Sequence, residues 1–312
     1  MIVPVNGVPG PKQLFGGGCA IPAHGTLASP SGKRGRVRRW ALWAGLFLAL
    51  MGALAYMGLR SEMIERFFFY FPEKGVDSDP ADIGLAFEDV FFQASDGVRL
   101  HGWFVPGQGE VVWLWFHGNA GNISHRLDNL KRVHDQLGVS VFLFDYRGYG
   151  RSEGRPTEAG IYRDAEAALA HLRSRTDINR ERIIYFGRSL GSAVAVELAT
   201  RHPPYALILE SAFESVSEMA RRGYPFLPVW PFLRGRYDSL AKLARVNTPL
   251  LVLHGDRDEI VPCEAGKRLF EAASGPKELS IIEGAGHNDT YLIGGLEYFS
   301  TLRSFMEKLE SG

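Results

Sequence analysis

The sequence predicts an α/β fold in which a mostly parallel central sheet carries helices on both faces. From about residue 87, short apolar runs of strand length alternate with longer segments whose apolar residues recur at helical spacing. Such alternation is typical of α/β sheets. Several of the apolar runs end in segments rich in Gly, His, Asp or Ser, and open α/β sheets carry their functional groups at the carboxyl ends of the strands.

An antiparallel hairpin is expected to open the sheet. Phe87–Phe92 and Val98–Val105 have strand character and are joined by a turn that contains Asp96-Gly97, a strong hairpin signal. Further strands are expected at Val111–Phe116, Ser140–Phe144, Ile183–Phe186, Ala206–Leu209, Leu250–Leu253 and Leu279–Ile282. Helices are expected around Ile161–Leu172, directly after Ser189, and at Ile293–Leu309.

The composition suits one large globular domain with an extension. The chain has 312 residues, of which 46% are hydrophobic, and it has 35 Lys+Arg against 35 Asp+Glu. This balance gives no reason to expect a nucleic-acid partner. Two cysteines cannot form a disulfide framework. Because the sequence has no Cys/His cluster with metal-ligand spacing, no dinucleotide fingerprint and no phosphate loop, we expect no cofactor.

The N-terminal region divides into three segments. Residues 1–39 are rich in Gly, Pro and Ala and end in a basic run, so we expect them to be disordered. Residues 40–59 contain no charged residue and are long enough to form a transmembrane helix or signal anchor. Residues 60–84 are expected to form a connector, and 85–312 the main folded domain with a short lid at about 212–240.

Charge asymmetry predicts the orientation of that span. The basic run precedes residues 40–59 and fewer Lys and Arg follow them, which predicts a single-pass protein with a cytoplasmic N-terminus and an extracytoplasmic domain. The alternative is a cleaved signal peptide and export, because Ala53-Leu54-Ala55 resembles a cleavage site. The aromatic run Phe67–Pro72 either packs on the domain or forms an aromatic belt at the membrane surface.

Gly187-Arg188-Ser189-Leu190-Gly191 is the most informative motif. An apolar run precedes it and a helical segment follows it, so Ser189 is expected on a sharp turn between a strand and a helix, where a nucleophilic serine is exposed. Gly150–Gly154 also fits the Gly-x-Ser-x-Gly pattern. Its Ser152, however, follows a Gly-rich turn and is soon followed by Pro156, so we interpret Ser152 as a solvated loop residue.

A nucleophilic serine needs a base and a group that orients the base. His287 lies in a Gly-flanked loop after a later strand, and Asp256, Asp258 and Glu259 follow the strand before it. The order serine, acid, histidine is that of α/β-hydrolases. The order leaves all three carboxylates open as the orienting acid.

Five segments carry a resemblance to a known family. They are HGNAGN (117–122), DYRGYGRSEG (145–154), GRSLGSA (187–193), HGDRDEIVP (254–262) and GAGH (284–287). With them, residues 85–310 resemble the α/β-hydrolase superfamily, and most closely its membrane-anchored α/β-hydrolase domain-containing subgroup. Ser192 departs from the pattern, since a glycine is common there.

The resemblance implies a role for each site residue. Asp258, three positions after the glycine that ends its strand, is the expected acid. It would orient His287, which would take the proton of Ser189. The oxyanion hole is expected from the backbone N–H groups of Leu190 and Asn119. DYRGYGRSEG is expected to have a structural role.

The substrate class follows from the lid and the anchor. Aromatic residues and arginines in 221–236 either cover the sheet edge or line an acyl pocket near lipid headgroups. We therefore expect a membrane-anchored serine hydrolase that cleaves carboxylic esters or thioesters of a small-molecule or lipid-like acyl substrate. The alternatives are a serine peptidase of aminopeptidase type and a non-catalytic binding module with the same fold.

Overall fold

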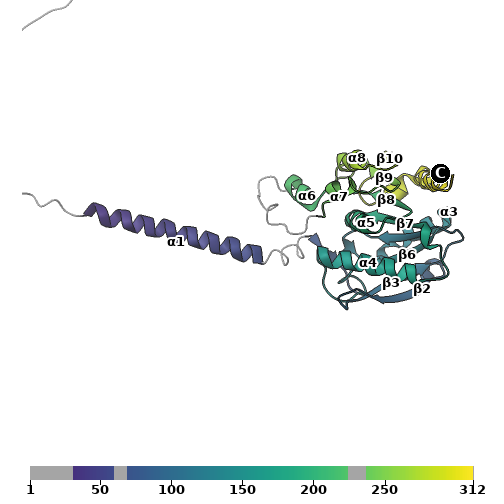
Figure 1. Ribbon diagram of the computed structural model, residues 1–312, viewed down its shortest axis with the longest axis horizontal. Coiled ribbons are helices and arrows are strands. Elements are labelled where there is room, and N and C mark those ends of the chain that lie inside the picture. The colour runs from purple at the N-terminus through teal and green to yellow at the C-terminus, as the bar shows by residue number, and fades with distance from the viewer. Residues whose placement is uncertain (1–30, 60–68, 224–236, 312) are drawn as a thin grey trace, which may run out of the picture. The chain divides into compact units, whose positions relative to one another are not determined.

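The computed structural model describes residues 31–59, 69–223 and 237–311 (Figure 1). The chain forms two compact units, Met1–Leu54 and Ala55–Gly312. Helix α1 runs from Ser31 to Leu59, so it begins inside the segment that the sequence predicts to be disordered; residues 1–30 lie outside the described residues. Within the described residues, no helix is both long and apolar enough to cross a bilayer. The predicted membrane span therefore stays a prediction from the sequence.

An eight-stranded sheet forms the centre of the second unit, in the order β10-β9-β8-β7-β4-β6-β3-β2. The first strands, β2 (Glu88–Gln93) and β3 (Arg99–Val105), form the expected hairpin, and β3 also pairs antiparallel with β6. All other pairs are parallel. The remaining strands are β4 (Val112–Phe116), β6 (Ser140–Asp145), β7 (Ile183–Arg188), β8 (Ala206–Glu210), β9 (Leu250–Gly255) and β10 (Lys277–Ile282). The mostly parallel sheet is as predicted.

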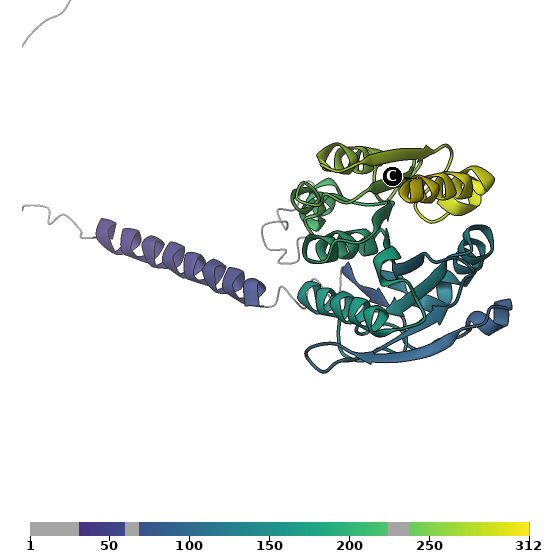
Figure 2. The same ribbon diagram turned by 45° about the vertical axis from the view of Figure 1, so that its right-hand side comes forward.

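Helices cover both faces of this sheet (Figure 2). Side chains alternate between the faces along each strand: Leu114 of β4 packs in one core, and its neighbours Trp113 and Trp115 pack in the other. The first core includes α4 (Glu158–Ser174), α5 (Leu190–Arg201), α7 (Ser239–Leu243) and α8 (Cys263–Ala272). The second includes α3 (Leu127–Leu137) and α10 (Gly295–Ser311). Every central strand is therefore buried on both sides, which explains its continuous apolar sequence.

Residues 69–84, which the sequence assigns to a connector, belong to the second unit and pack within it. Strand β1 (Phe71–Pro72) pairs with β5 (Ala120–Gly121), and Tyr70 is buried with its hydroxyl 2.8 Å from that of Tyr237. A short 3-10 helix, η1, follows at Pro80–Ile83. Two other 3-10 helices lie at Ile123–Arg126 (η2) and Arg180–Arg182 (η3). Tyr70 therefore packs on the domain, which is the first of the two alternatives for the aromatic run. Residues 67 and 68 lie outside the described residues.

The last predicted helix differs from the structure. The expected helix Ile293–Leu309 is divided into α9 (Thr290–Ile293) and α10, because the chain changes direction at Gly294 and Gly295, where Gly295 has φ 48°. In the predicted lid, α6 covers Val216–Gly223, and residues 224–236 lie outside the described residues.

Candidate active site

The predicted site residues lie at the carboxyl ends of strands that are close together in the sheet. Asn119 follows β4, Ser189 joins β7 to α5, Asp258 follows β9 and His287 follows β10. Only β8 separates β7 from β9. The sheet order therefore brings together residues that are far apart in the sequence.

Ser189 lies on a tight turn with an uncommon backbone conformation. Its φ is 53° and its ψ is −117°, a strained region for a residue with a side chain. The turn is possible because Gly187 and Gly191 have no side chains: a Cβ at Gly191 would lie 1.9 Å from the carbonyl oxygen of Phe116. The N–H of Ser189 donates to the carbonyl of Glu210, and the hydroxyl of Ser192 donates to that of Gly187. The hydrogen bond from the Ser192 hydroxyl thus stabilises the turn.

Ser189, His287 and Asp258 form a hydrogen-bonded chain. The Oγ of Ser189 lies 3.0 Å from Nε2 of His287, and Nδ1 of His287 lies 2.8 Å from Oδ2 of Asp258. Arg188 holds the histidine loop, since its Nη2 donates to the carbonyl of His287 over 2.8 Å. The geometry lets the imidazole accept a proton from the serine while its other nitrogen donates to the carboxylate.

Asp258 is held as an ionised acceptor. Its Oδ1 accepts the backbone N–H groups of Ile260 and Val261, and His254 lies 3.3 Å from its Oδ2. Burial alone raises the pKa of this carboxyl, but the hydrogen bonds from His254 and His287 outweigh burial, and the pKa lies well below its ordinary value. The carboxylate is therefore negative over the whole physiological pH range.

The two other candidate carboxylates do not contact His287. Asp256 accepts the backbone N–H of Gly284 at 2.6 Å, and Glu259 is exposed. Asp289 precedes α9, but its side chain accepts the N–H of Gly286 instead of a helix N–H.

The loop after β4 is held in place by residues from outside the loop. The carbonyl of Asn119 accepts the N–H of Phe71 at 3.1 Å and the hydroxyl of Tyr149 at 2.8 Å. The Asn119 side chain donates to the carbonyl of Phe69 at 2.7 Å. Its side chain thus has a structural bond, and the bonds to its carbonyl hold the peptide group between Asn119 and Ala120. Leu190 is the first residue of α5, where N–H groups have no partner within the helix.

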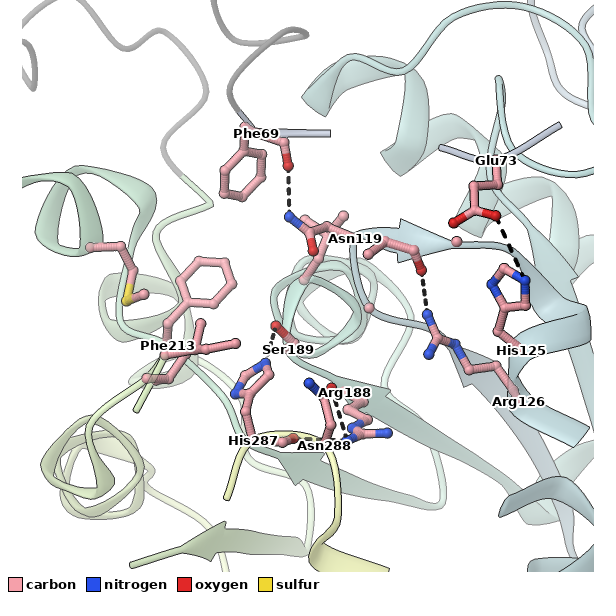
Figure 3. Close-up of a pocket in the computed structure, with 17 residues that line it drawn as sticks. Phe69, Glu73, Asn119, His125, Arg126, Arg188, Ser189, Phe213, His287 and Asn288 are labelled. Carbon is pink, nitrogen blue, oxygen red and sulfur yellow. Dashed lines mark hydrogen bonds and ion pairs between the residues drawn. The ribbon is translucent and has the colours of Figure 1, made fainter. Parts of the chain in front are cut away.

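Ser189 opens into a pocket of about 400 Å³ (Figure 3). Besides His287, Asn119 and Leu190, the pocket is lined by side chains that the sequence did not indicate as site residues. They are Phe69, Glu73, His125, Arg126, Arg188, Phe213, Met219, Ile260, Val261 and Asn288. Some of these carry a signal in the sequence: Arg188 and Asn288 lie next to predicted site residues, and four others lie in the motif at 254–262 (Ile260, Val261) or in the predicted lid (Phe213, Met219). The others reach the pocket through long-range packing.

Ser152 is not part of this pocket, and its interpretation as a solvated loop residue is wrong. It is 1% exposed; its hydroxyl donates to the carbonyl of Asp145 and accepts the N–H of His101. DYRGYGRSEG has the expected structural contacts: Arg147 pairs with Asp164 and Asp96. Within the described residues, no group of three His, Cys, Asp or Glu side chains could hold a metal ion.

Comparisons with known proteins identify the family of this chain. Residues 109–236 and 228–290 match the family described as "Serine aminopeptidase, S33". An uncharacterised protein of Mycobacterium tuberculosis is 42% identical over 78% of this chain and 87% of its own length. An α/β-hydrolase domain-containing protein of Arabidopsis thaliana is 41% identical over 73% of this chain and 81% of its own.

Solved structures show the same fold. An esterase of Pyrococcus furiosus superposes with a TM-score of 0.65 at 23% identity and covers 76% of this chain and 98% of its own. The ferulic-acid complex of Est1E from Butyrivibrio proteoclasticus superposes with a TM-score of 0.61 at 20% identity, over 72% and 100%. The chain therefore belongs to the family described as "Serine aminopeptidase, S33" and, with that family, to the α/β-hydrolase superfamily.

Proposed function

We propose that the chain is a serine hydrolase that cleaves carboxylic esters or thioesters through an acyl-enzyme. The observation that carries this proposal is the contact of Ser189 with His287 at 3.0 Å, and of His287 with Asp258 at 2.8 Å, at the wall of a pocket. A serine hydroxyl is a weak nucleophile until an oriented base takes its proton. In this proposal Ser189 is the nucleophile, His287 is the base and Asp258 orients the base.

The reaction has two displacement steps. The Ser189 oxygen attacks the carbonyl carbon of the ester while its proton moves to Nε2 of His287. The tetrahedral intermediate then expels the alcohol or thiol, which takes that proton from His287, and the acyl group stays on Ser189. Water, deprotonated by His287, releases the carboxylic acid and restores the serine. Asp258 stabilises the imidazolium in both steps.

The negative oxygen of each tetrahedral intermediate needs two N–H donors. The backbone N–H groups of Leu190 and Asn119 are the proposed pair. The N–H of Asn119 shares its peptide group with the carbonyl of Gly118, and this carbonyl lies 2.6 Å from Nδ1 of His117 before substrate arrives. A donor held in place in this way does not have to reorganise during the reaction, which is the main source of its effect.

The pocket supports an acyl substrate. Phe69, Phe213 and Met219 line it together with Ile260 and Val261, and this apolar wall suits an alkyl or aryl chain. A second candidate is peptide cleavage of aminopeptidase type, which the family description names. The carboxylate of Glu73 in the pocket favours it, since it could pair with a substrate ammonium group.

A substrate panel separates the two candidates. We expect kcat/KM for p-nitrophenyl esters to rise as the acyl chain lengthens from two carbons to eight, because each added methylene buries more apolar surface, worth about 0.8 kcal/mol when fully buried. Aminoacyl p-nitroanilides, assayed beside them, should be cleaved far more slowly. Faster cleavage of the anilides, together with its loss in Glu73→Gln, would establish the peptidase instead.

A membrane anchor is a separate proposal that rests on the sequence. Residues 40–59 have no charged residue and follow a basic run, so we infer an uncleaved anchor with the catalytic domain on the extracytoplasmic side. The full-length chain should sediment with membranes and resist alkaline carbonate. Protease added to the outside of intact cells or spheroplasts should digest the domain; digestion only after lysis would reverse the orientation, and recovery of a shortened soluble chain would establish a cleaved signal.

A further inference from the structure

The pocket around Ser189 has an apolar half and a cationic half. In Figure 3, Phe69 and Phe213 lie on one side of Ser189, and the guanidinium groups of Arg126 and Arg188 lie on the other. A substrate bound across Ser189 therefore meets apolar side chains at one end and positive charge at the other.

Arg126 has hydrogen-bonding capacity that the described part of the protein does not use. Its Nη2 donates to the carbonyl of Ala120, whereas its Nε is buried and has no hydrogen-bond partner. Among the described residues, no carboxylate forms an ion pair with it. Arg126 as a whole is half-buried and lines the pocket, so its guanidinium can meet an acceptor there, and a planar oxyanion is the acceptor that a guanidinium fits best.

Arg188 adds to the positive field but is itself engaged. Its Nε lies 3.4 Å from the buried carboxylate of Glu210, and its Nη2 donates to the carbonyl of His287. Burial and then the charge of Arg188 lower the pKa of Arg126 to about 10, while Asp145 acts in the opposite direction. Arg126 thus remains protonated at neutral pH.

Among the described residues that line the pocket, Glu73 carries the one carboxylate. Glu73 is largely exposed and lies 3.8 Å from His125, and Figure 3 shows both beyond Arg126 as seen from Ser189. Glu73 therefore does not stand between Arg126 and the reacting centre. An anion that reached Arg126 from Ser189 would meet the guanidinium first.

We propose that Arg126 binds a carboxylate or phosphate on the alcohol side of the scissile ester. This inference rests on the proposed function. The apolar half accommodates the acyl chain, so the leaving group extends to Arg126 and Arg188. The substrate class is then an ester whose acyl part is apolar and whose alcohol part is anionic, and Arg126 is a specificity residue.

The experiment compares substrates that differ in charge but hardly in shape. Octanoyl esters of 4-hydroxybenzoate, 4-hydroxybenzamide and 4-hydroxyphenyl phosphate are assayed with the full-length protein. We expect the kcat/KM ratio of anionic ester to carboxamide ester to exceed tenfold, and to fall about tenfold or more in Arg126→Gln, as for loss of a hydrogen bond between charged groups. Arg126→Lys should restore much of the ratio, because it restores the charge.

A matched control removes one positive charge elsewhere. Arg132 lies on α3, the helix that follows Arg126 directly, is exposed and pairs with Asp128, so Arg132→Gln should leave the ratio unchanged. If Arg126 only holds the loop at Ala120, Arg126→Gln would slow all three esters equally, and the unchanged ratio would overturn the proposal. A wild-type kcat/KM ratio of anionic ester to carboxamide ester near one would also overturn the proposal.

Failure of the proposed function has a different signature. If Ser189→Ala hydrolyses the three esters as fast as the wild type, the serine mechanism itself is wrong. If hydrolysis depends on Ser189 but not on charge, only the anionic substrate class is wrong. A ratio that depends on Arg126 for either anion supports the proposal, and the larger ratio identifies the anion.

Discussion

Replacement of Ser189 by alanine should lower kcat for ester hydrolysis on the order of 10⁶-fold. The variant keeps the turn and its neighbours, but it has no atom that can form the acyl-enzyme. Rates of p-nitrophenyl octanoate hydrolysis, measured at saturating substrate, test the expectation. The melting temperature should stay the same or rise, because alanine at the turn keeps the fold and removes a polar atom from a strained position.

The matched control is the second serine of the same pattern. Ser152→Ala should keep full turnover per folded molecule, since Ser152 does not reach the pocket. It should also lower the free energy of unfolding by about 1–3 kcal/mol, because the variant leaves the buried N–H of His101 without its acceptor. A Ser189→Ala protein with wild-type turnover, or a folded Ser152→Ala protein with none, would contradict the assignment.

Asp258→Asn should lower kcat about 10⁴-fold while substrate binding is retained. The amide has nearly the same shape as the carboxylate, but it does not stabilise the imidazolium of His287 and favours the wrong tautomer. Asp256→Asn and Glu259→Gln are the matched controls, because neither carboxylate contacts His287, and both should keep turnover within a few-fold. Equal losses in Asp258→Asn and Asp256→Asn would show that the loop, not the carboxylate, matters.

The pH profile adds a second test of Asp258. Because its pKa is below the ordinary value in the folded protein, the carboxylate is ionised above that ordinary value in both the folded and unfolded states. Its contribution to stability is therefore full at neutral pH and is lost only as the pH falls below the ordinary carboxylate range. Wild type and Asp258→Asn should converge in stability in strong acid, as equilibrium unfolding at a series of pH values would show.

The sequence predicts the sheet and the strand ends well, for a physical reason. Central strands such as Val112–Phe116 are buried on both faces, so their apolar runs are continuous and easily recognised. Strand β10 is less buried, and its polar start at Lys277 gives no signal. Helix α3 was not predicted, because only four apolar residues interrupt a polar segment (Leu127, Leu130, Val133 and Leu137). The break at Gly294 depends on packing that periodicity does not report.

The site was predictable only where chemistry restricts the residue type. Ser189, Asp258 and His287 carry strict requirements of type and order, and the structure brings them together. The pocket wall carries no such requirement: Phe69 lines the pocket because β1 pairs with β5, a contact between segments far apart in sequence. Arg126 likewise has no motif, since its significance lies in what surrounds its guanidinium. The residues of the proposed catalytic mechanism can therefore be predicted from the sequence, whereas the residues of the proposed specificity depend on how the chain packs.

Covalent labelling of the serine tests the central claim most directly. A fluorophosphonate reacts only with a serine that a neighbouring base has activated, and peptide mapping by mass spectrometry locates the adduct. We expect stoichiometric modification of Ser189 in the wild type, none in Ser189→Ala, and much slower modification in His287→Ala. An adduct on a different serine, or labelling that persists in folded Ser189→Ala protein, would contradict the account.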